Sequence, residues 1–324
     1  MSAANAALAL PEGAVVPDGL PPMPLAPVTG WRIHLGAHKT ATTHLQETLS
    51  ALRPALLAQG VDNIPIQLLR QHRIARALGR KQVWNRVAPL RGPMLRRLLA
   101  RELDPLRAGP GNLVLSEEKL LGSSQDVFAE PIYPGLERIV TLLATLGRHA
   151  ELTLFLSIRS FDAQLPSAYV QELRYMPPIA GGFDNIRPRV LARPPSWFEL
   201  VRRIRAAAPG VRLRIWRQED YRDNTAAILA AVCGVDRLGP LPEVADPHWT
   251  KSPSLEAIRA VEALPPLPEL ERRERVRAIF RADDAGGGPP FRPFSDAERA
   301  LLRAAYAADL ARIAALDPEL LLRF

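Results

Sequence analysis

The sequence predicts an α/β protein, a three-layer sandwich in which helices cover both faces of a mainly parallel sheet. Short apolar runs alternate along the chain with longer segments whose apolar residues recur at helical spacing. The run at residues 113–115 is continuously apolar, as expected for a parallel strand that is covered on both faces. The chain has 324 residues with 47% hydrophobic content, enough to bury one sizeable core.

Four short runs are predicted to be strands, because they are bounded by turn residues and rich in Leu, Ile and Val. The segments between and after them have the apolar periodicity of amphipathic helices. The predicted strands are residues 31–35, 113–115, 151–160 and 211–221, and residues 61–65 resemble a short extended piece. The predicted helices are residues 43–60, 66–84, 91–109, 137–150, 161–175, 196–210, 254–264 and 295–316.

Composition divides the chain into three parts. Residues 1–28 are rich in Pro, Ala and Gly and are predicted to form a poorly ordered tail. Residues 29–245 form the predicted α/β core, and residues 246–324 a helical extension packed on it. Within the core, residues 176–195 are rich in Pro, Gly and Arg and are predicted to be a loop that covers the substrate.

The charge balance favours an anionic ligand or surface. Net charge is +8 and the pI is near 10.2, although an arginine-rich composition with no partner behind it is the alternative. The arginines are scattered and not interleaved with aromatics, which argues against a nucleic-acid surface. Cys233 is the single cysteine, so disulfides and cysteine-based zinc sites are not expected.

The first residues of the sequence lack the basic region and sustained apolar core of a secretory signal. No run approaches the roughly 18 consecutive apolar residues of a membrane span. We therefore expect a cytoplasmic protein without a membrane span.

The segment WRIHLGAHKTATT, residues 31–43, has the pattern of a buried strand, a tight turn and a helix start. A helix start offers free N–H groups and a positive dipole end, which together with hydroxyls and a lysine suit a phosphate or sulfate group. A nucleotide-hydrolysing P-loop requires a glycine directly before the lysine, where this chain has His38. The alternative is an ordinary strand-to-helix turn in which these side chains only cap and solubilise.

The pattern G-x-x-K-T-[GA]-T-T in this segment resembles the 5′-phosphosulfate-binding loop of the sulfotransferase superfamily, particularly its bacterial members. The family usually has a glycine where this chain has Ala41. The resemblance implies that the loop binds the 5′-phosphosulfate of 3′-phosphoadenosine 5′-phosphosulfate. The residues implied are Gly36, Lys39, Thr40, Ala41, Thr42 and Thr43.

A second candidate element is Arg159, at the end of the fourth predicted strand, with Ser167 eight residues later on the following helix. Ligands of open α/β sheets gather at the carboxyl ends of the strands, so both are expected in the same crevice as the Lys39 loop. A guanidinium and a hydroxyl recognise a dianionic phosphate well. The segment RSFDAQLPSAY resembles the sulfotransferase element that holds the 3′-phosphate, whereas Arg159 alone would suggest a surface ion pair.

The third element is the acidic pair Glu117 and Glu118, just past the third predicted strand. The resemblance places residues here that orient or deprotonate the acceptor, and Glu117, the earlier carboxylate, is our candidate base. Two acidic residues are also a common way to begin a helix. His38 is the competing base, and His72, on a predicted helix, is assigned a structural role.

The resemblance extends over residues 29–324, since the C-terminal stretch is similar to the helical region of bacterial sulfotransferase-like proteins. It implies a P-loop-like sulfotransferase fold and sulfuryl transfer to a hydroxylated small-molecule or saccharide acceptor. Lys39 would stabilise the leaving phosphate, and no metal is implied. The alternatives are a nucleotide-binding protein of this fold without catalysis, and a P-loop kinase.

Overall fold

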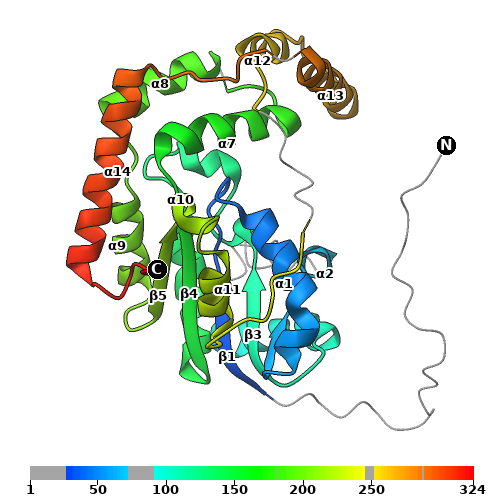
Figure 1. Cartoon of the computed structure of the whole chain (residues 1–324), viewed down its shortest axis with the longest axis vertical. Coiled ribbons are helices and arrows are strands. Elements are labelled where there is room, and N and C mark those ends of the chain that lie inside the picture. The colour runs from blue at the N-terminus through cyan, green and yellow to red at the C-terminus, as the bar shows by residue number, and fades with distance from the viewer. Residues whose placement is uncertain (1–26, 72–90, 180, 245–251, 287) are drawn as a thin grey trace, which may run out of the picture.

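The computed structural model describes residues 27–71, 91–179, 181–244, 252–286 and 288–324, and it has an α/β fold built on a parallel sheet (Figure 1). All pairings in the sheet are parallel, and the strand order is β2-β3-β1-β4-β5. The four predicted strands and the mainly parallel sheet are therefore confirmed, and the extended piece at residues 61–65 contains a fifth strand. The strands are β1 (Val28–His34), β2 (Val61–Asn63), β3 (Gly111–Ser116), β4 (Glu151–Ile158) and β5 (Arg212–Arg217).

Helices connect the strands and continue beyond the last of them. The α-helices of the described residues are α1 (Thr42–Leu57), α2 (Ile66–Gln71), α5 (Arg91–Leu103), α6 (Leu136–Ala144), α7 (Phe161–Tyr175), α8 (Gly182–Ala192), α9 (Trp197–Ala207), α10 (Gln218–Tyr221), α11 (Thr225–Cys233), α12 (Leu255–Glu262), α13 (Glu269–Gly286) and α14 (Asp296–Leu316). Short 3₁₀ helices occur as η2 (Asp104–Leu106), η3 (Glu118–Leu120), η4 (Ser124–Phe128) and η5 (Thr145–Arg148). None of the helices in these ranges is long and apolar enough to cross a membrane.

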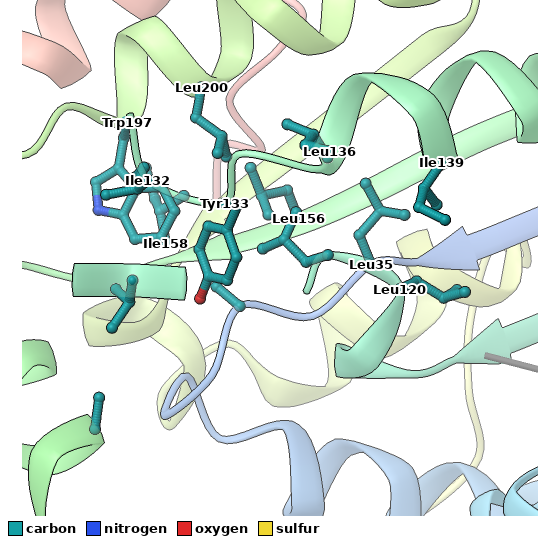
Figure 2. Packing of buried hydrophobic residues seen from close by; sticks show 14 of the residues in the cluster. Leu35, Leu120, Ile132, Tyr133, Leu136, Ile139, Leu156, Ile158, Trp197 and Leu200 are labelled. Carbon is teal, nitrogen blue, oxygen red and sulfur yellow. The ribbon is translucent and has the colours of Figure 1, made fainter. Parts of the chain in front are cut away.

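The sheet is covered on both faces, because successive residues of its strands point to opposite sides. Leu154 of β4 packs with α5, α6 and α9 on one face, and its neighbour Phe155 packs with α1 and α11 on the other. Figure 2 shows part of the first of these layers, where Leu156 and Ile158 of β4 meet Leu200 of α9. The continuous apolar run 113–115 of β3 follows from the same two-sided burial.

The connections change faces around β1, the central strand. The helix that follows β1, α1, packs on one face, whereas α6 and α9 lie on the other. In open α/β sheets, ligands bind at such a switch point, outside the carboxyl ends of the strands. Helix α7 crosses these ends in Figure 1, so the turn after β1 lies beneath it.

The C-terminal helix α14 is joined to the core by buried polar contacts. Its Asp309 accepts hydrogen bonds from the Trp197 backbone N–H (2.6 Å) and the Ser196 hydroxyl (2.9 Å), which begin α9. Burial raises the pKa of Asp309. The helix starts with a capping box formed by Ser295 and Glu298.

One prediction about the fold is wrong, and three others fall wholly or partly outside the described residues. The prediction that residues 176–195 form a loop is wrong, because α8 spans Gly182–Ala192 and buries Phe183, Ile186 and Val190 at helical spacing. Pro188 inside the helix and the glycines at its start hid this period in the sequence. The predicted helix 66–84 is described only as α2, and His72 and most of the 1–28 tail lie outside the described residues.

Candidate functional site

The turn between β1 and α1 holds three residues in the left-handed region. Gly36, Lys39 and Ala41 have φ values of 60°, 67° and 62°. For a residue with a Cβ this conformation costs about 1–2 kcal/mol, so a glycine would be less strained than Ala41 at this position. Ala41 is the N-cap of α1 and provides no side-chain cap. The first backbone N–H groups of α1 therefore have no partner within the helix.

The threonines of the turn point in different directions. The Thr40 hydroxyl donates to the Ala37 carbonyl (2.6 Å), and Thr42 makes a longer contact with the same oxygen (3.5 Å). Both side chains are buried, whereas Thr43 is exposed. The expectation that all three hydroxyls face a ligand is therefore wrong. Thr40 and Thr42 stabilise the turn through their contacts with the Ala37 carbonyl, and Thr43 is the one of the three with its side chain at the surface. We call the Thr40 contact the Thr40 staple.

Lys39 projects into a pocket of about 450 Å³ at the carboxyl edge of the sheet. Burial lowers the pKa of Lys39, nearby Arg174 and Arg159 lower it further, and Glu118 opposes them. Within the described part of the chain, no ion pair neutralises this ammonium group. A partly desolvated cation without a partner attracts an anionic ligand.

Arg159 lies against the turn, as the sequence predicts. Its Nη1 donates to the Lys39 carbonyl (3.1 Å), and its own carbonyl accepts from Trp197 Nε1 (2.8 Å). The end of β4 is thereby fixed to the turn that follows β1. The prediction that these two segments share one crevice is confirmed.

Arg159 also lines a second pocket, of about 330 Å³, where several arginines gather. Asp162 organises them: its carboxylate accepts from Arg303 Nε (2.9 Å), Arg299 Nε (3.5 Å) and the Ser160 hydroxyl (2.5 Å). Sequence reasoning missed Arg299 and Arg303, which come from α14. Their spacing of four residues places both on one face of that helix, but only its packing against α7 brings that face to the pocket.

The two pockets adjoin each other, and we refer to the pair as the cleft. Ser167 and Val170 of α7 line both of them, together with Ser252. Ser167 therefore stands between the Lys39 end and the Arg159 end of the cleft. Both predicted 3′-phosphate residues line the second pocket.

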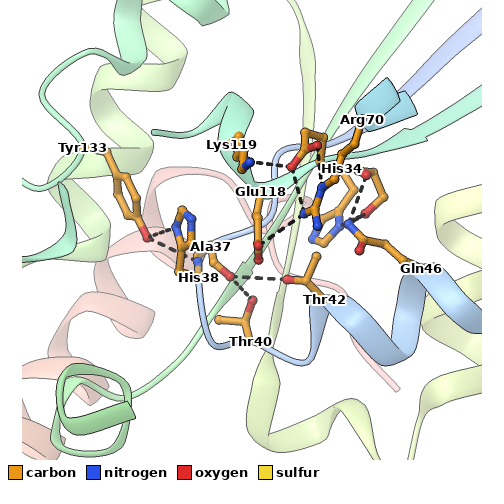
Figure 3. Close-up of polar contacts among 12 residues, drawn as sticks. His34, Ala37, His38, Thr40, Thr42, Gln46, Arg70, Glu118, Lys119 and Tyr133 are labelled. Carbon is orange, nitrogen blue, oxygen red and sulfur yellow. Dashed lines mark hydrogen bonds and ion pairs between the residues drawn. The ribbon is translucent and has the colours of Figure 1, made fainter. Parts of the chain in front are cut away.

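The two acidic residues after β3 have different surroundings, and Figure 3 shows the second of them, Glu118, with Arg70. Glu117 is only 2% exposed; its carboxylate binds Arg70 through two contacts, of 3.1 and 3.2 Å, and accepts from the Lys119 backbone N–H. Glu118 is 22% exposed and lines the pocket with Lys39, with one Arg70 contact of 3.4 Å. The expectation that Glu117 is the carboxylate facing the pocket is wrong, because Glu117 caps η3 and turns toward Arg70.

His38 points away from the cleft. Its backbone N–H donates to the Tyr133 hydroxyl (3.3 Å), and its Nδ1 lies 3.4 Å from the same oxygen. Burial lowers the pKa of His38, with Glu118 opposing. The imidazole lines neither pocket of the cleft, so its surroundings are those of a structural residue.

The cleft thus combines an anion-accepting turn, a lysine with no ion-pair partner among the described residues, a cluster of arginines and the carboxylates of Glu47 and Glu118. This arrangement can hold a ligand with two separated anionic groups and can take a proton from a third group beside Lys39. In comparisons with known proteins, no family model matches the chain and no curated protein matches it. Its function is therefore inferred from the chemistry of the cleft.

Proposed function

We propose that the protein is a sulfotransferase that moves a sulfuryl group from 3′-phosphoadenosine 5′-phosphosulfate to a hydroxyl group. The observation that carries the proposal is the contact of Arg159 Nη1 with the Lys39 carbonyl (3.1 Å). It joins the two segments that resemble the sulfotransferase superfamily, which are 120 residues apart in the sequence. A P-loop-like sulfotransferase fold for residues 29–245 is part of the proposal, supported by the anion-accepting turn between central strand β1 and α1.

The residues present fit the two anionic ends of this co-substrate. Lys39, the Thr43 hydroxyl and the first N–H groups of α1 would hold the 5′-phosphosulfate. Arg159 and Ser167 would hold the 3′-phosphate, with Arg299 and Arg303 at the wall of the same pocket. Guanidinium groups suit this end, because they bind a phosphate dianion through paired hydrogen bonds.

When bound, the co-substrate supplies an activated sulfuryl group with a good leaving group. Lys39 would stabilise the negative charge that develops on the leaving phosphate, at a position where burial strengthens the interaction. Glu118, on the same pocket wall, would take the proton of the acceptor hydroxyl. Arg70 holds Glu118 in place and neutralises the buried Glu117 beside it.

Polar side chains around Lys39 support a hydroxylated acceptor such as a saccharide. Amides of Gln67 and Gln171 and the carboxylate of Glu47 line this part of the cleft, with Tyr175 at its exposed rim. A side-chain amide can both donate a hydrogen bond to a hydroxyl group and accept one from it, and a carboxylate can accept one. An exposed aromatic ring presents an apolar face with a polar tip.

A P-loop kinase would use the hydroxyl that follows the lysine as a ligand for Mg²⁺. Here that hydroxyl belongs to Thr40, which is buried and donates to the Ala37 carbonyl. The turn would have to rearrange before Thr40 could reach a metal ion. The kinase alternative is therefore less well supported than sulfuryl transfer.

Calorimetric titration with adenosine 3′,5′-bisphosphate, adenosine 5′-phosphate and ATP tests the proposal. We expect the bisphosphate to bind about 10–100-fold more tightly than the monophosphate, since a charged hydrogen bond contributes about 1.5–3 kcal/mol. A screen of hydroxylated acceptors with sulfur-labelled co-substrate then separates an enzyme from a binding protein. Preferred binding and Mg²⁺-dependent turnover of ATP would contradict the proposal.

A further inference from the structure

Five side chains beneath the anion-accepting turn form a continuous chain of hydrogen bonds, which we call the His34 relay. Gln46 Nε2 contacts the Ser116 hydroxyl (3.3 Å), which contacts His34 Nδ1 (2.9 Å). On the other side of the ring, His34 Nε2 lies 3.3 Å from the Ser157 hydroxyl, which lies 2.5 Å from the Thr40 hydroxyl. All five side chains are buried, and Figure 3 shows His34, Gln46 and Thr40 around the turn.

The sheet register brings these residues together. His34, the last residue of β1, pairs with Ser116 of β3 on one side and with Phe155 of β4 on the other. Ser157 lies two residues beyond Phe155 on the same strand, one step closer to the turn. The indole of Trp216 stacks on the His34 ring at 4.9 Å and fixes its plane. The relay thus crosses three strand ends and finishes at the turn.

The contacts impose one order on the protons of the relay. Thr40 donates its only hydroxyl proton to the Ala37 carbonyl (2.6 Å), so Ser157 must donate to Thr40. Ser157 has then used its own proton, so His34 Nε2 must carry a proton and donate to Ser157. Ser116 accepts from Gln46 and donates to the unprotonated Nδ1. Burial lowers the pKa of His34 to about 3, in agreement with a neutral ring.

We propose that His34, as the neutral Nε2–H tautomer, is a positioning residue for the anion-accepting turn. It orients Ser157, and through Ser157 the Thr40 staple that holds Lys39 and Ala41 in their left-handed conformations. The proposal rests on the proposed function only in taking a 5′-phosphate as the bound group. It predicts that Thr40, although buried, affects ligand binding without touching the ligand.

Matched variants separate positioning from direct contact and from stability. Thr40→Val keeps the shape of the side chain and removes its hydroxyl, whereas Thr40→Ser keeps the hydroxyl. Ser157→Ala removes a relay member that is fully buried and cannot contact a ligand. Thr48→Val is the control, because Thr48 is an equally buried α1 hydroxyl that donates to the His44 carbonyl, away from the relay.

Affinity for adenosine 5′-phosphate is the first measurement. We expect Thr40→Val and Ser157→Ala to bind about five- to tenfold more weakly, the equivalent of one lost hydrogen bond. Thr40→Ser and Thr48→Val should stay within about twofold of wild type, with thermal unfolding reporting the stability of all four variants. Unchanged affinity in both Thr40→Val and Ser157→Ala would overturn the proposal.

Nitrogen-15 NMR of the histidine rings in the unliganded wild type provides a second test that does not depend on the nucleotide. We expect a neutral His34 with its proton on Nε2 at neutral pH, and Ser157→Ala should shift the amide resonances of Lys39 and Ala41. An Nδ1–H tautomer, or turn amides unchanged by Ser157→Ala, would contradict the relay. If the relay passes this test and wild type binds none of the three nucleotides, the proposed function fails while the positioning role stands.

Discussion

The two ends of the cleft are prepared for an anion in different ways. At the Lys39 end, hydroxyls turn inward to hold the backbone, and the ammonium group has no ion-pair partner among the described residues. At the Arg159 end, the buried carboxylate of Asp162 holds Arg299 and Arg303 in place. An unpaired lysine can stabilise negative charge that develops in the transition state. Arginines that are already held in place by a carboxylate bind the phosphate in the ground state. We therefore expect changes at the first end to affect turnover and changes at the second to affect affinity.

The largest effect is expected from the carboxylate beside Lys39. Glu118→Gln should lower kcat by about 10²–10⁴-fold, the usual contribution of a general base, and leave the affinity for adenosine 3′,5′-bisphosphate nearly intact. Glu117→Gln is the matched variant. It should retain most activity but lose about 1–3 kcal/mol of unfolding free energy, because Arg70 loses a charged partner. A lower kcat in Glu117→Gln than in Glu118→Gln would assign the general base to Glu117 instead.

Lys39→Ala should come next. Removing one group that stabilises transition-state charge costs about 10²–10³-fold in kcat, and we expect the bisphosphate affinity to fall by less than that. Steady-state kinetics and calorimetry on the same preparations measure both quantities. Lys119→Ala, nearby on η3 and outside both pockets, controls for loss of a positive charge. If the substitution lowers only the nucleotide affinity and not kcat, Lys39 binds the nucleotide, as proposed for Arg159, and does not stabilise the transition state.

Lowering the pH should reduce the unfolding free energy of the protein through His34, which lies beneath the Lys39 turn. Its folded-state pKa of about 3 lies below the ordinary 6.5, so only the unfolded chain takes up this proton between those pH values. Stability from this residue is therefore present above pH 6.5 and is lost as the pH falls toward 3. Denaturant unfolding between pH 6 and 4 should show a slope about 1.4 kcal/mol per pH unit steeper in wild type than in His34→Gln. Equal slopes would mean that His34 titrates normally in the folded state.

Arg159→Ala tests the clamp at the other end. It should remove most of the preference for adenosine 3′,5′-bisphosphate over adenosine 5′-phosphate, a loss of about 1.5–3 kcal/mol. Ser167→Ala should have a smaller effect in the same direction, because a neutral hydroxyl contributes less than a charged group. Arg214→Ala is the control, because Arg214 of β5 pairs with Glu319 and lies outside the cleft. An unchanged preference in the Arg159 variant would remove the 3′-phosphate site.

The smallest expected effect concerns strain in the turn. Ala41→Gly relieves a left-handed Ala worth about 1–2 kcal/mol, but makes the unfolded chain more flexible by about 0.4–1 kcal/mol. Chemical denaturation should therefore show a gain of about 0.5–1 kcal/mol, with little change in nucleotide affinity. A clear loss of stability would mean that the Ala41 methyl makes packing contacts that outweigh the strain.

Features that depend on local pattern are the ones that the sequence predicts best. Strands covered on both faces leave continuous apolar runs, as in β4, and parallel strands bring their carboxyl ends together, which places Arg159 beside the Lys39 turn. Features that depend on distant partners were missed. Which of Glu117 and Glu118 faces the pocket depends on Arg70 of α2. The inward direction of the Thr40 hydroxyl depends on Ser157 of β4. The position of Arg299 and Arg303 depends on the packing of α14 against the core.

A crystal structure with adenosine 3′,5′-bisphosphate tests the proposed use of the cleft most directly, because it locates both phosphates in one measurement. We expect the 5′-phosphate within hydrogen-bonding distance of Lys39 Nζ and the first N–H groups of α1. We expect the 3′-phosphate on Arg159 and Ser167, on the side of the cleft that faces α14. A nucleotide bound in the reverse orientation, or outside the cleft, would contradict the proposed function of the two ends.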